Sequence, residues 1–444
     1  MPGPRTCRLV TLGCKVNQYE TQYVKELLEA NGYAEAADGR PADLCLVNTC
    51  TVTHEADAKG RQLIRRLAHE NPGAALVVTG CFAARDPDAV ARLPGVTRVI
   101  PDKERLAEGL REFGVTRLPR GISRFDGHQR AFVKVQDGCL LSCTFCIIPK
   151  VRPILRSRPP EEIIEEIARL VAGGCQEIVL TGIHLGHYGI DRSRGRPKSA
   201  WCRLWHLLER VGRLPGDFRV RLSSLEAAEA RDDLVRAMAD NPRICPHLHL
   251  CLQSGSDRVL ARMRRRYRAA GFLERCRRLR AALDRPALTT DVIVGFPGET
   301  DADFEETCRV VREAGFSKVH VFSFSRRRGT PAAGFGDSVP PAVVAERRER
   351  LRELERELAA SYYRSLLGRR LEVLVEGADP QRAGWVRGTS CRYAPVAFEG
   401  FAPALVRRLV PVRAEAVADG VILARPEPQA GAAARVALPL AGCS

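Results

Sequence analysis

The sequence predicts an α/β protein of several domains: a parallel-sheet domain first, a full or partial β/α barrel in the centre, and a small β-barrel last. Apolar runs of strand length alternate with helical patterns through most of the 444 residues, which is typical of parallel sheets. Alternating polar and apolar residues after position 370 favour a small antiparallel barrel. A chain of this length exceeds a single hydrophobic core, and about three domains is the usual number.

The first domain is expected over residues 1–120 and has the pattern of a Rossmann-like fold. Its apolar runs read as buried strands and its amphipathic stretches as helices. The strands are expected at 8–13, 43–49 and 75–80, and the helices at 19–31 and 55–70. Strands that alternate with helices in this way predict a parallel sheet.

Each of these three apolar runs is followed at once by a cysteine, namely Cys14, Cys50 and Cys81. The carboxyl ends of parallel strands lie at one edge of a sheet, where ligands gather in open α/β folds. We therefore expect the three thiols to converge and to bind an iron–sulfur cluster. The alternative is that the three are unrelated core cysteines. A fourth cysteine, Cys45, lies within its strand among apolar neighbours and is better interpreted as a core residue than as a ligand.

The second domain is expected over residues 125–362 and opens with the densest cysteine motif of the chain. Cys139, Cys143 and Cys146 follow the strand-like run 131–136. Three thiolates this close together can hold a 4Fe-4S cluster whose fourth iron stays open to a ligand. A zinc site or a chance group of buried thiols is the alternative, but zinc motifs usually pair two C-x2-C units, and no second pair occurs here.

The rest of the second domain repeats the strand and helix pattern, as a β/α barrel does. A helix is expected at 160–173, and strands are expected at 177–182, 218–222, 247–252, 288–294 and 318–324. Hydroxyl groups, a carboxylate and a glycine turn follow several of these strands, where a barrel places its active site. These candidate cofactor-binding residues are Ser223, Ser254, Ser256, Asp291 and Gly295. Ordinary strand-to-helix turns explain the same residues equally well.

The third domain is expected over residues 363–427, after a long charged helix at 343–366. Its strands are expected at 371–376, 384–388, 404–410 and 412–424. Small barrels of the OB type often bind RNA through basic grooves. The candidate RNA-binding residues are Arg387, Arg392, Arg407 and Arg408, although each could equally belong to a solvated charged surface. Residues 428–444 are rich in Ala, Pro and Gly and are expected to be disordered.

Composition indicates the partners and the compartment. The net charge of +17 and the isoelectric point near 9.5 favour a polyanion such as nucleic acid, although an Arg-biased genome would also raise the charge. No long apolar run or signal-peptide pattern occurs, so we expect a cytoplasmic protein without a membrane partner. In the cytoplasm the 16 cysteines would be reduced and available as metal ligands.

The motifs together resemble the tRNA methylthiotransferase family over nearly the whole chain. The resemblance covers an N-terminal domain with Cys14, Cys50 and Cys81, a radical S-adenosylmethionine (SAM) domain with Cys139, Cys143 and Cys146, and an RNA-binding domain of the TRAM type. The segments 11–21 and 181–186 resemble the bacterial branch that acts on N6-threonylcarbamoyladenosine at position 37 of tRNA. Three Arg-rich segments, 191–200, 264–268 and 326–328, depart from the family pattern.

The resemblance implies two 4Fe-4S clusters and SAM as cofactors. One SAM would methylate sulfur held at the N-terminal cluster, and a second would be cleaved to a radical that takes hydrogen from C2 of the adenine. It also implies three partners: the tRNA anticodon loop, an electron donor such as flavodoxin or ferredoxin, and a sulfur source. Two alternatives are open: a methylthiotransferase for another modified adenosine or a ribosomal protein, and a non-catalytic, cluster-bearing RNA-binding or redox-sensing protein.

Overall fold

The computed structural model describes residues 5–428, which divide into two compact units between Leu358 and Ala359. The disordered tail expected at 428–444 lies, except for Pro428, outside the described residues. None of the helices within 5–428 is both long and apolar enough to cross a membrane.

The first unit begins with a five-stranded sheet in which all neighbours are parallel, in the order β2-β1-β3-β4-β5. The strands are β1 (Arg5–Thr11), β2 (Tyr33–Glu35), β3 (Leu44–Thr49), β4 (Ala75–Gly80) and β5 (Val96–Ile100). The helices are α1 (Lys15–Glu29), α2 (His54–Glu70), α3 (Cys81–Arg85), α4 (Pro87–Ala91) and α5 (Leu106–Gly109). The strand order reverses between β1 and β3, which is the usual place of a ligand in such sheets.

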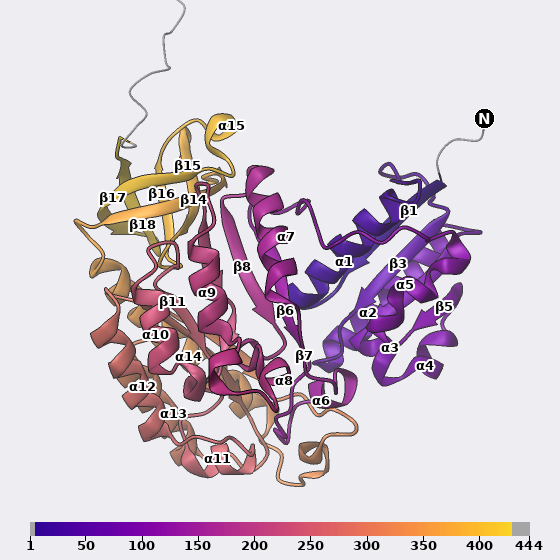
Figure 1. The fold of residues 1–444 in the computed structure, drawn as a ribbon. Coiled ribbons are helices and arrows are strands. Elements are labelled where there is room, and N and C mark those ends of the chain that lie inside the picture. Colours follow the sequence, from indigo (N-terminus) through magenta and orange to yellow (C-terminus); the bar gives the residue numbers. More distant parts are fainter. Residues whose placement is uncertain (1–4, 429–444) are drawn as a thin grey trace, which may run out of the picture. The chain divides into compact units, whose positions relative to one another are not determined.

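Two apolar layers cover this sheet (Figure 1). Leu44 and Leu46 of β3 pack with Leu27 of α1, whereas the alternate residue Val47 packs with Ile64 of α2. Helix α1 also buries a second face, because its Tyr19 belongs to the core of the central strands, and α1 runs beside β6 (Ala131–Asp137). The helix therefore joins the N-terminal sheet to the rest of the unit.

The central strands form two neighbouring sheets, β7-β6-β8-β9 and β10-β11-β12-β13. Ser223 alone separates β9 from β10, so the parallel strands follow one another in chain order. Within residues 5–428, β13 does not pair with β6, so the barrel is partial. The bounds are β7 (Arg156–Ser157), β8 (Glu177–Gly182), β9 (Arg219–Leu222), β10 (Ser224–Leu225), β11 (His247–Leu250), β12 (Ala287–Val294) and β13 (Lys318–Ser323).

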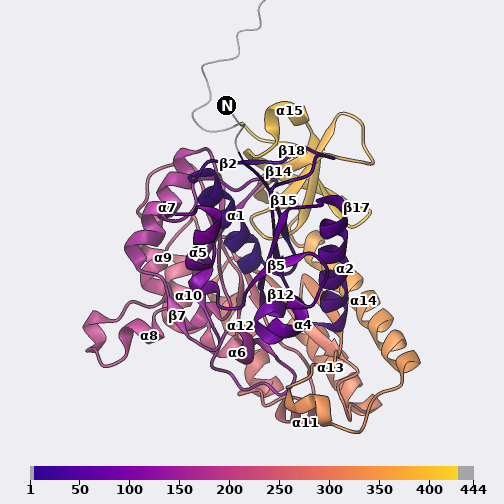
Figure 2. The same cartoon turned by 90° about the vertical axis from the view of Figure 1, so that its right-hand side faces the viewer.

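Helices cover the outer face of these strands (Figure 1, Figure 2). They are α7 (Pro160–Ala172), α9 (Leu204–Gly212), α10 (Asp232–Ala239), α12 (Ala269–Ala282) and α13 (Asp301–Ala314). The remaining helices of the unit are α6 (Ile148–Val151), α8 (Ile190–Ser193), α11 (Asp257–Arg262) and most of α14 (Pro341–Arg364). Short 3-10 turns are Lys103–Arg105, Arg111–Phe113, Leu185–His187, Lys198–Ala200, Ala227–Glu229 and Pro331–Gly334.

The inner face of the partial barrel is polar. Leu248, Leu250 and Val292 point outward into the helical core, so the alternate residues His249 and Asp291 point inward. Arg221 of β9 and His320 of β13 take equivalent inward positions. A polar interior of this kind suits a ligand-binding cavity better than a packed core.

The second unit contains a closed barrel in the order β14-β15-β16-β18-β17. Its elements are β14 (Arg370–Ala378), β15 (Trp385–Ser390), β16 (Pro395–Glu399), α15 (Ala402–Leu405), β17 (Leu409–Ala418) and β18 (Val421–Pro426). Buried apolar residues such as Val373, Phe398 and Ile422 fill the interior.

Three details of the expected barrel are wrong. The strand expected at 404–410 is replaced by α15 and a turn with Arg407 at φ +69°, because Pro403 favours the first turn of a helix. The expected strand 412–424 is divided between β17 and β18 by a turn at Asp419 and Gly420, both of which have positive φ. Strand β16 was not expected at all.

Candidate functional site

The structure brings the three N-terminal cysteines to one edge of the sheet. Cys14 caps α1 directly after β1, Cys50 follows β3, and Cys81 begins α3 after β4. Strands β3 and β4 are paired up to Thr49 and Gly80, the residues directly before Cys50 and Cys81. Adjacent strands lie about 4.8 Å apart, so the thiols that follow them are neighbours. Their role as cluster ligands is still a prediction.

Two glycines make this convergence possible. Gly13 has φ +110°, and a Cβ added to it would lie 2.8 Å from Cβ of Cys50. Gly80 has φ +99°, and a Cβ there would lie 2.3 Å from the backbone nitrogen of Thr49. Both positions need a residue without a side chain, because only then can the backbone turn this tightly beside Cys50.

The second cysteine set lies in the loop between β6 and α6. The Thr144 amide donates to the carbonyl of Met263 (3.1 Å), and the Cys146 amide donates to the carbonyl of Cys143 (3.2 Å). Phe145 packs against an apolar cluster that contains Met263 and Phe296. Burial raises the pKa of the Cys146 thiol to about 12, so this thiol is protonated unless a metal binds it.

Two side chains approach the sulfur atoms of this loop. Arg265 donates from Nη1 to Sγ of Cys143 (3.3 Å), and Nδ1 of His184 lies 3.4 Å from Sγ of Cys139. Both residues lie in segments that the sequence singles out, 181–186 and 264–268, but no sequence motif assigns either residue to the site. Because 122 residues separate Arg265 from Cys143, only the fold makes this contact visible.

The candidate cofactor-binding residues have different surroundings. Ser223 offers a buried hydroxyl that has no hydrogen-bond partner within the described residues. Ser254 is fully buried and contacts Thr307, whereas Ser256 caps α11 and donates to Asp303 (2.6 Å). The Gly295 amide donates to Glu299 (2.7 Å). Ser223 therefore has the free hydrogen-bonding capacity of a ligand contact, and the others support the local turns.

Asp291 belongs to the polar inner face of the barrel. It lies 3.3 Å from Nε2 of His249, whose Nδ1 is 3.0 Å from the Thr289 hydroxyl. The ligand atoms of His249, Cys251 and Asp291 all lie within 4.8 Å of one another. Lys15, the residue after Cys14, interacts electrostatically with Asp291 across this face. Its side chain is open to solvent, and no ion pair or side-chain hydrogen bond of Lys15 occurs among residues 5–428.

A buried ionic network joins α1 to the central strands. Glu20 accepts from Lys103 (2.5 Å), Lys134 (2.8 Å) and Arg152 (2.9 Å). Arg152 also donates to Asn17 (3.0 Å) and pairs with Asp137 (2.7 Å).

Burial opposes the ionisation of Glu20, but the three cations keep its pKa well below the usual range. The network ties the helix that follows Cys14 to the strand that precedes Cys139.

A second buried contact lies next to the other two N-terminal cysteines, Cys50 and Cys81. Arg327, whose side chain is 1% exposed, pairs with Asp57 and donates to the Thr51 hydroxyl (3.0 Å). Arg85 pairs with the same carboxylate. Thr51 follows Cys50, and Arg85 lies on the helix that begins at Cys81. The central part of the unit therefore contacts the N-terminal domain close to its cysteine edge.

The sequence matches known proteins over almost its whole length. Residues 133–311 match the radical SAM superfamily, and residues 6–101 match the uncharacterized protein family UPF0004. The threonylcarbamoyladenosine tRNA methylthiotransferase MtaB of Chlamydia pneumoniae is 42% identical over 93% of this chain and 96% of its own. The chain belongs to the tRNA methylthiotransferase family. Membership of the radical SAM superfamily implies SAM and one 4Fe-4S cluster.

Other members of the methylthiotransferase family match almost as well. MtaB of Bacillus subtilis is 40% identical over 88% of this chain and 89% of its own. A tRNA-2-methylthio-N(6)-dimethylallyladenosine synthase of Nocardia farcinica is 38% identical over 87% and 81%. The radical SAM methyltransferase TsrM of Kitasatospora setae, at 14% identity and a TM-score of 0.51 over 74% of this chain and 77% of its own, shares the fold.

The loop of Cys139, Cys143 and Cys146 fits a 4Fe-4S cluster. Its three thiols lie in one short loop, and two of them have a basic side chain at the sulfur, as a cluster with net negative charge favours. The N-terminal set offers the same number of thiols at a sheet edge, which suits a second cluster.

Proposed function

We propose that the protein transfers a methylthio group to C2 of N6-threonylcarbamoyladenosine at position 37 of tRNA. The observation that carries this proposal is the presence of two three-cysteine sets within one compact unit of a methylthiotransferase. Cys139, Cys143 and Cys146 would hold the radical SAM cluster, and Cys14, Cys50 and Cys81 would hold a second one. When bound, the first cluster supplies the electron that cleaves SAM, and the second holds the sulfur to be transferred.

The side chains of the site act by positioning. An aromatic C–H is not acidic enough for a side chain to remove its proton. The protein therefore need only orient the adenine and exclude water. The Glu20 and Arg327 networks would keep the two cysteine sets at a fixed separation. The Ser223 hydroxyl and, less directly, Ser254, Ser256, Asp291 and Gly295 are proposed to shape the SAM site.

The inner face of the barrel favours the threonylcarbamoyl substrate over a dimethylallyl one. The threonyl group carries a carboxylate, which a cationic side chain binds through a charge-assisted hydrogen bond. Lys15 follows Cys14, interacts electrostatically with Asp291, and lacks an ion-pair partner among the described residues. We propose that its ammonium group binds the substrate carboxylate. An apolar dimethylallyl group would gain nothing from this polar face.

The barrel of the second unit is proposed to bind the anticodon loop of tRNA. Arg387 lies half-buried on β15, and Arg407 and Arg408 are exposed before β17. Arg392 is 8% exposed, so its guanidinium offers little surface. We also propose a cytoplasmic location, because the substrate would be tRNA, with an electron donor such as flavodoxin or ferredoxin and a sulfur source as further partners.

The first test is substrate choice. The anaerobically reconstituted protein, with SAM and reductant, is incubated separately with tRNA that carries threonylcarbamoyladenosine or dimethylallyladenosine. Mass spectrometry of the nucleosides should detect the 2-methylthio product from the first tRNA. Product from the second tRNA alone would contradict the substrate assignment, and absence of 5′-deoxyadenosine in both reactions would exclude the radical enzyme.

The second test is the number of clusters. We expect about eight irons per chain, and about four after Cys14→Ala, Cys50→Ala or Cys81→Ala, while SAM cleavage survives. Cys45→Ala is the matched control, because Cys45 is a core cysteine of the same sheet. Unchanged iron in all three variants would contradict the proposal that these cysteines bind a second cluster.

A further inference from the structure

The two side chains that contact the sulfurs of Cys139 and Cys143 are each paired with a glutamate. Glu226 pairs with Arg265, and Glu229 pairs with His184. Both glutamates come from the short segment that follows β10: Glu226 caps the 3-10 turn Ala227–Glu229, and Glu229 is its last residue. One short 3-10 turn with its N-cap residue therefore supplies a carboxylate to both donors, although the donors come from different parts of the chain.

Both pairs are shielded from water. The side chains of Arg265 and His184 are 4% and 5% exposed, and those of their glutamates are 18% and 16% exposed. Arg265 also lies over the ring of Tyr267, 5.0 Å from its centre. In such surroundings charges interact more strongly than they do at a protein surface.

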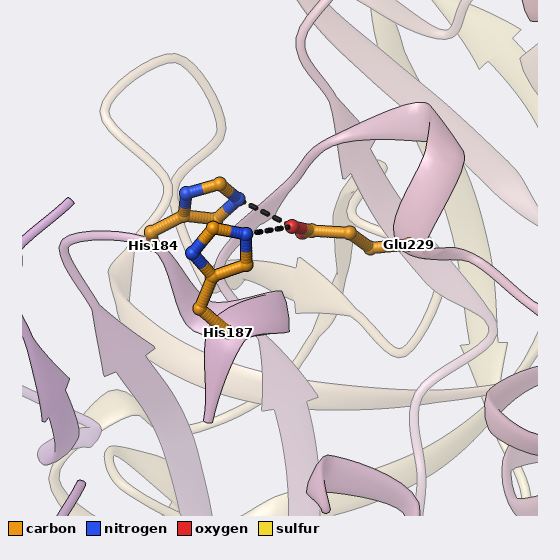
Figure 3. A group of neighbouring side chains, drawn as sticks. All are labelled: His184, His187 and Glu229. Carbon is orange, nitrogen blue, oxygen red and sulfur yellow. Dashed lines mark ion pairs between the residues drawn. The ribbon is translucent and has the colours of Figure 1, made fainter. Parts of the chain in front are cut away.

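Further contacts fix the His184 pair (Figure 3). The His187 ring stacks on the His184 ring at 3.6 Å, and its Nε2 lies 3.3 Å from Glu229. The His184 amide donates to Gln136 (2.7 Å) at the end of β6. A Cβ on Gly186 would overlap the Glu229 carboxylate, so a larger residue there would displace this carboxylate. The imidazole is held on both sides before any cofactor binds.

Hydrogen bonds and positive charge at a ligand sulfur have a defined effect on a cluster. They stabilise the reduced cluster, which carries one more negative charge, and so raise its reduction potential. A carboxylate behind the donor opposes part of this effect, because it neutralises the positive charge. The balance between donor and carboxylate then determines how easily the cluster accepts an electron.

We propose that Arg265 and His184, each opposed by its glutamate, are positioning residues that set the reduction potential of the cluster bound by Cys139, Cys143 and Cys146. The pairs orient two of the three ligand sulfurs and add a charge that is largely, but not fully, compensated. This inference rests on the proposed function only for those three ligands, and neither the tRNA substrate nor the second cluster enters it.

The test is a redox titration of the cluster followed by electron paramagnetic resonance, without SAM or tRNA. The full-length protein carries Cys14→Ala, Cys50→Ala and Cys81→Ala, so that a single cluster contributes to the signal. Arg265→Gln should lower the potential and Glu226→Gln should raise it. We expect each to change the ratio of reduced to oxidised cluster at least about tenfold at a fixed applied potential, which is about 59 mV for one electron.

The opposite directions in which Arg265→Gln and Glu226→Gln should shift the reduction potential distinguish this role from a purely structural one. A loosened loop would shift both variants in the same direction, and that result would overturn the proposal. His184→Gln and Glu229→Gln should repeat the pattern with a smaller shift. Arg268→Gln is the matched control, because this arginine comes from the same Arg-rich segment and is 84% exposed; its shift should be negligible.

Two further outcomes would also contradict the proposal. If Arg265→Gln weakened SAM binding in equilibrium dialysis without moving the potential, Arg265 would contact the cofactor instead. If Arg265→Lys, which keeps the charge, and Glu226→Gln both lost the iron, the pair would be purely structural. Failure of the parent protein to bind iron at all would instead refute the cluster assignment itself.

Discussion

At the residue scale, the N-terminal cysteine edge depends on positions that carry no chemistry. Gly13 and Gly80 adopt positive φ and lie against Cys50 and Thr49. A thiol can be replaced without disturbing the backbone, but these glycines cannot. Cys50 itself is buried, and burial raises the pKa of its thiol to about 11. The edge therefore depends on an unusual backbone, and its Cys50 thiol is protonated unless a metal binds it.

Gly80→Ala should destabilise the fold and reduce bound iron. The added Cβ would lie 2.3 Å from the Thr49 nitrogen, in addition to the strain of φ +99°. We expect a loss of at least about 2 kcal/mol in the free energy of unfolding, measured by urea denaturation. Gly73→Ala is the control, because Gly73 has φ +85° but open space around it. Equal losses in both variants would mean that the contact with Thr49 contributes nothing.

Lys15→Gln should weaken recognition of threonylcarbamoyladenosine. A hydrogen bond to a charged group is worth about 1.5–3 kcal/mol, so KM for the tRNA should rise about 10- to 100-fold. Lys15→Arg keeps the charge and should recover most of the affinity. Lys59→Gln, on the exposed face of α2, removes the same charge elsewhere and should leave KM unchanged. An unchanged KM in Lys15→Gln would remove Lys15 from the substrate site.

At the scale of elements, α1 connects the two cysteine sets. Its first residue follows Cys14, and its second turn carries Glu20. Glu20 pairs with Lys103 in the turn before α5, with Lys134 on β6 and with Arg152 after α6. Removal of one partner from such a group leaves the others buried and uncompensated. The helix is therefore fixed by charge as well as by apolar packing.

Glu20→Gln should cost about 3–5 kcal/mol in the free energy of unfolding of the metal-free protein. Glu29→Gln, on the same helix, breaks an exposed pair with Arg124 and should cost less than about 1 kcal/mol. Similar losses for the two variants would contradict a role for the buried network.

The same network predicts how stability depends on pH. Burial opposes ionisation of Asp137, but Lys134 and Arg152 lower its pKa from 3.8 to about 2, and the pKa of Glu20 is lowered as well. Carboxyl groups with a lowered pKa in the folded state stabilise it above their unfolded pKa and lose that effect as the pH falls. Urea denaturation of the metal-free protein should show stability falling from about pH 4.5 toward pH 2, less steeply in Glu20→Gln. An equal slope in both proteins would contradict this assignment.

At the scale of the whole molecule, the cysteine sets and the small basic barrel lie in different compact units. The first unit holds both cysteine sets and the polar barrel interior, and the second is a separate closed barrel with basic residues. RNA binding mainly reflects contacts between cations and phosphates, which are sensitive to salt. Chemistry and tRNA affinity should therefore respond to different substitutions.

Arg387→Gln combined with Arg408→Gln should weaken tRNA binding while leaving iron content unchanged. Each lost phosphate contact should reduce the slope of log affinity against log salt by about 1. Filter binding at several salt concentrations measures both quantities. Arg425→Gln is the control, because Arg425 is already paired with Glu415. An unchanged slope in the double variant would exclude these arginines from the RNA contact.

Most of the architecture was predictable because it depends on local patterns. Strand-length apolar runs, helical periodicity and the positions of Cys14, Cys50 and Cys81 at strand ends are properties of neighbouring residues. The start of α1 was expected four residues late, because Cys14 occupies its N-cap without a side-chain hydrogen bond and so gives none of the usual signals. Strand β16 and helix α15 were not predicted because both are short and lie in a segment rich in turns.

By itself, the sequence determined the two cysteine sets, the parallel sheets that position them and the family to which the chain belongs. Only the tertiary structure decided which charged residues meet at those sets. Arg265 contacts Cys143, from which it is separated by 122 positions in the sequence, and Arg327 contacts Asp57, from which it is separated by 270 positions. A cluster motif needs only a few adjacent residues, whereas a buried ion pair needs two distant segments to be brought together, and no local pattern records which partner the fold will supply.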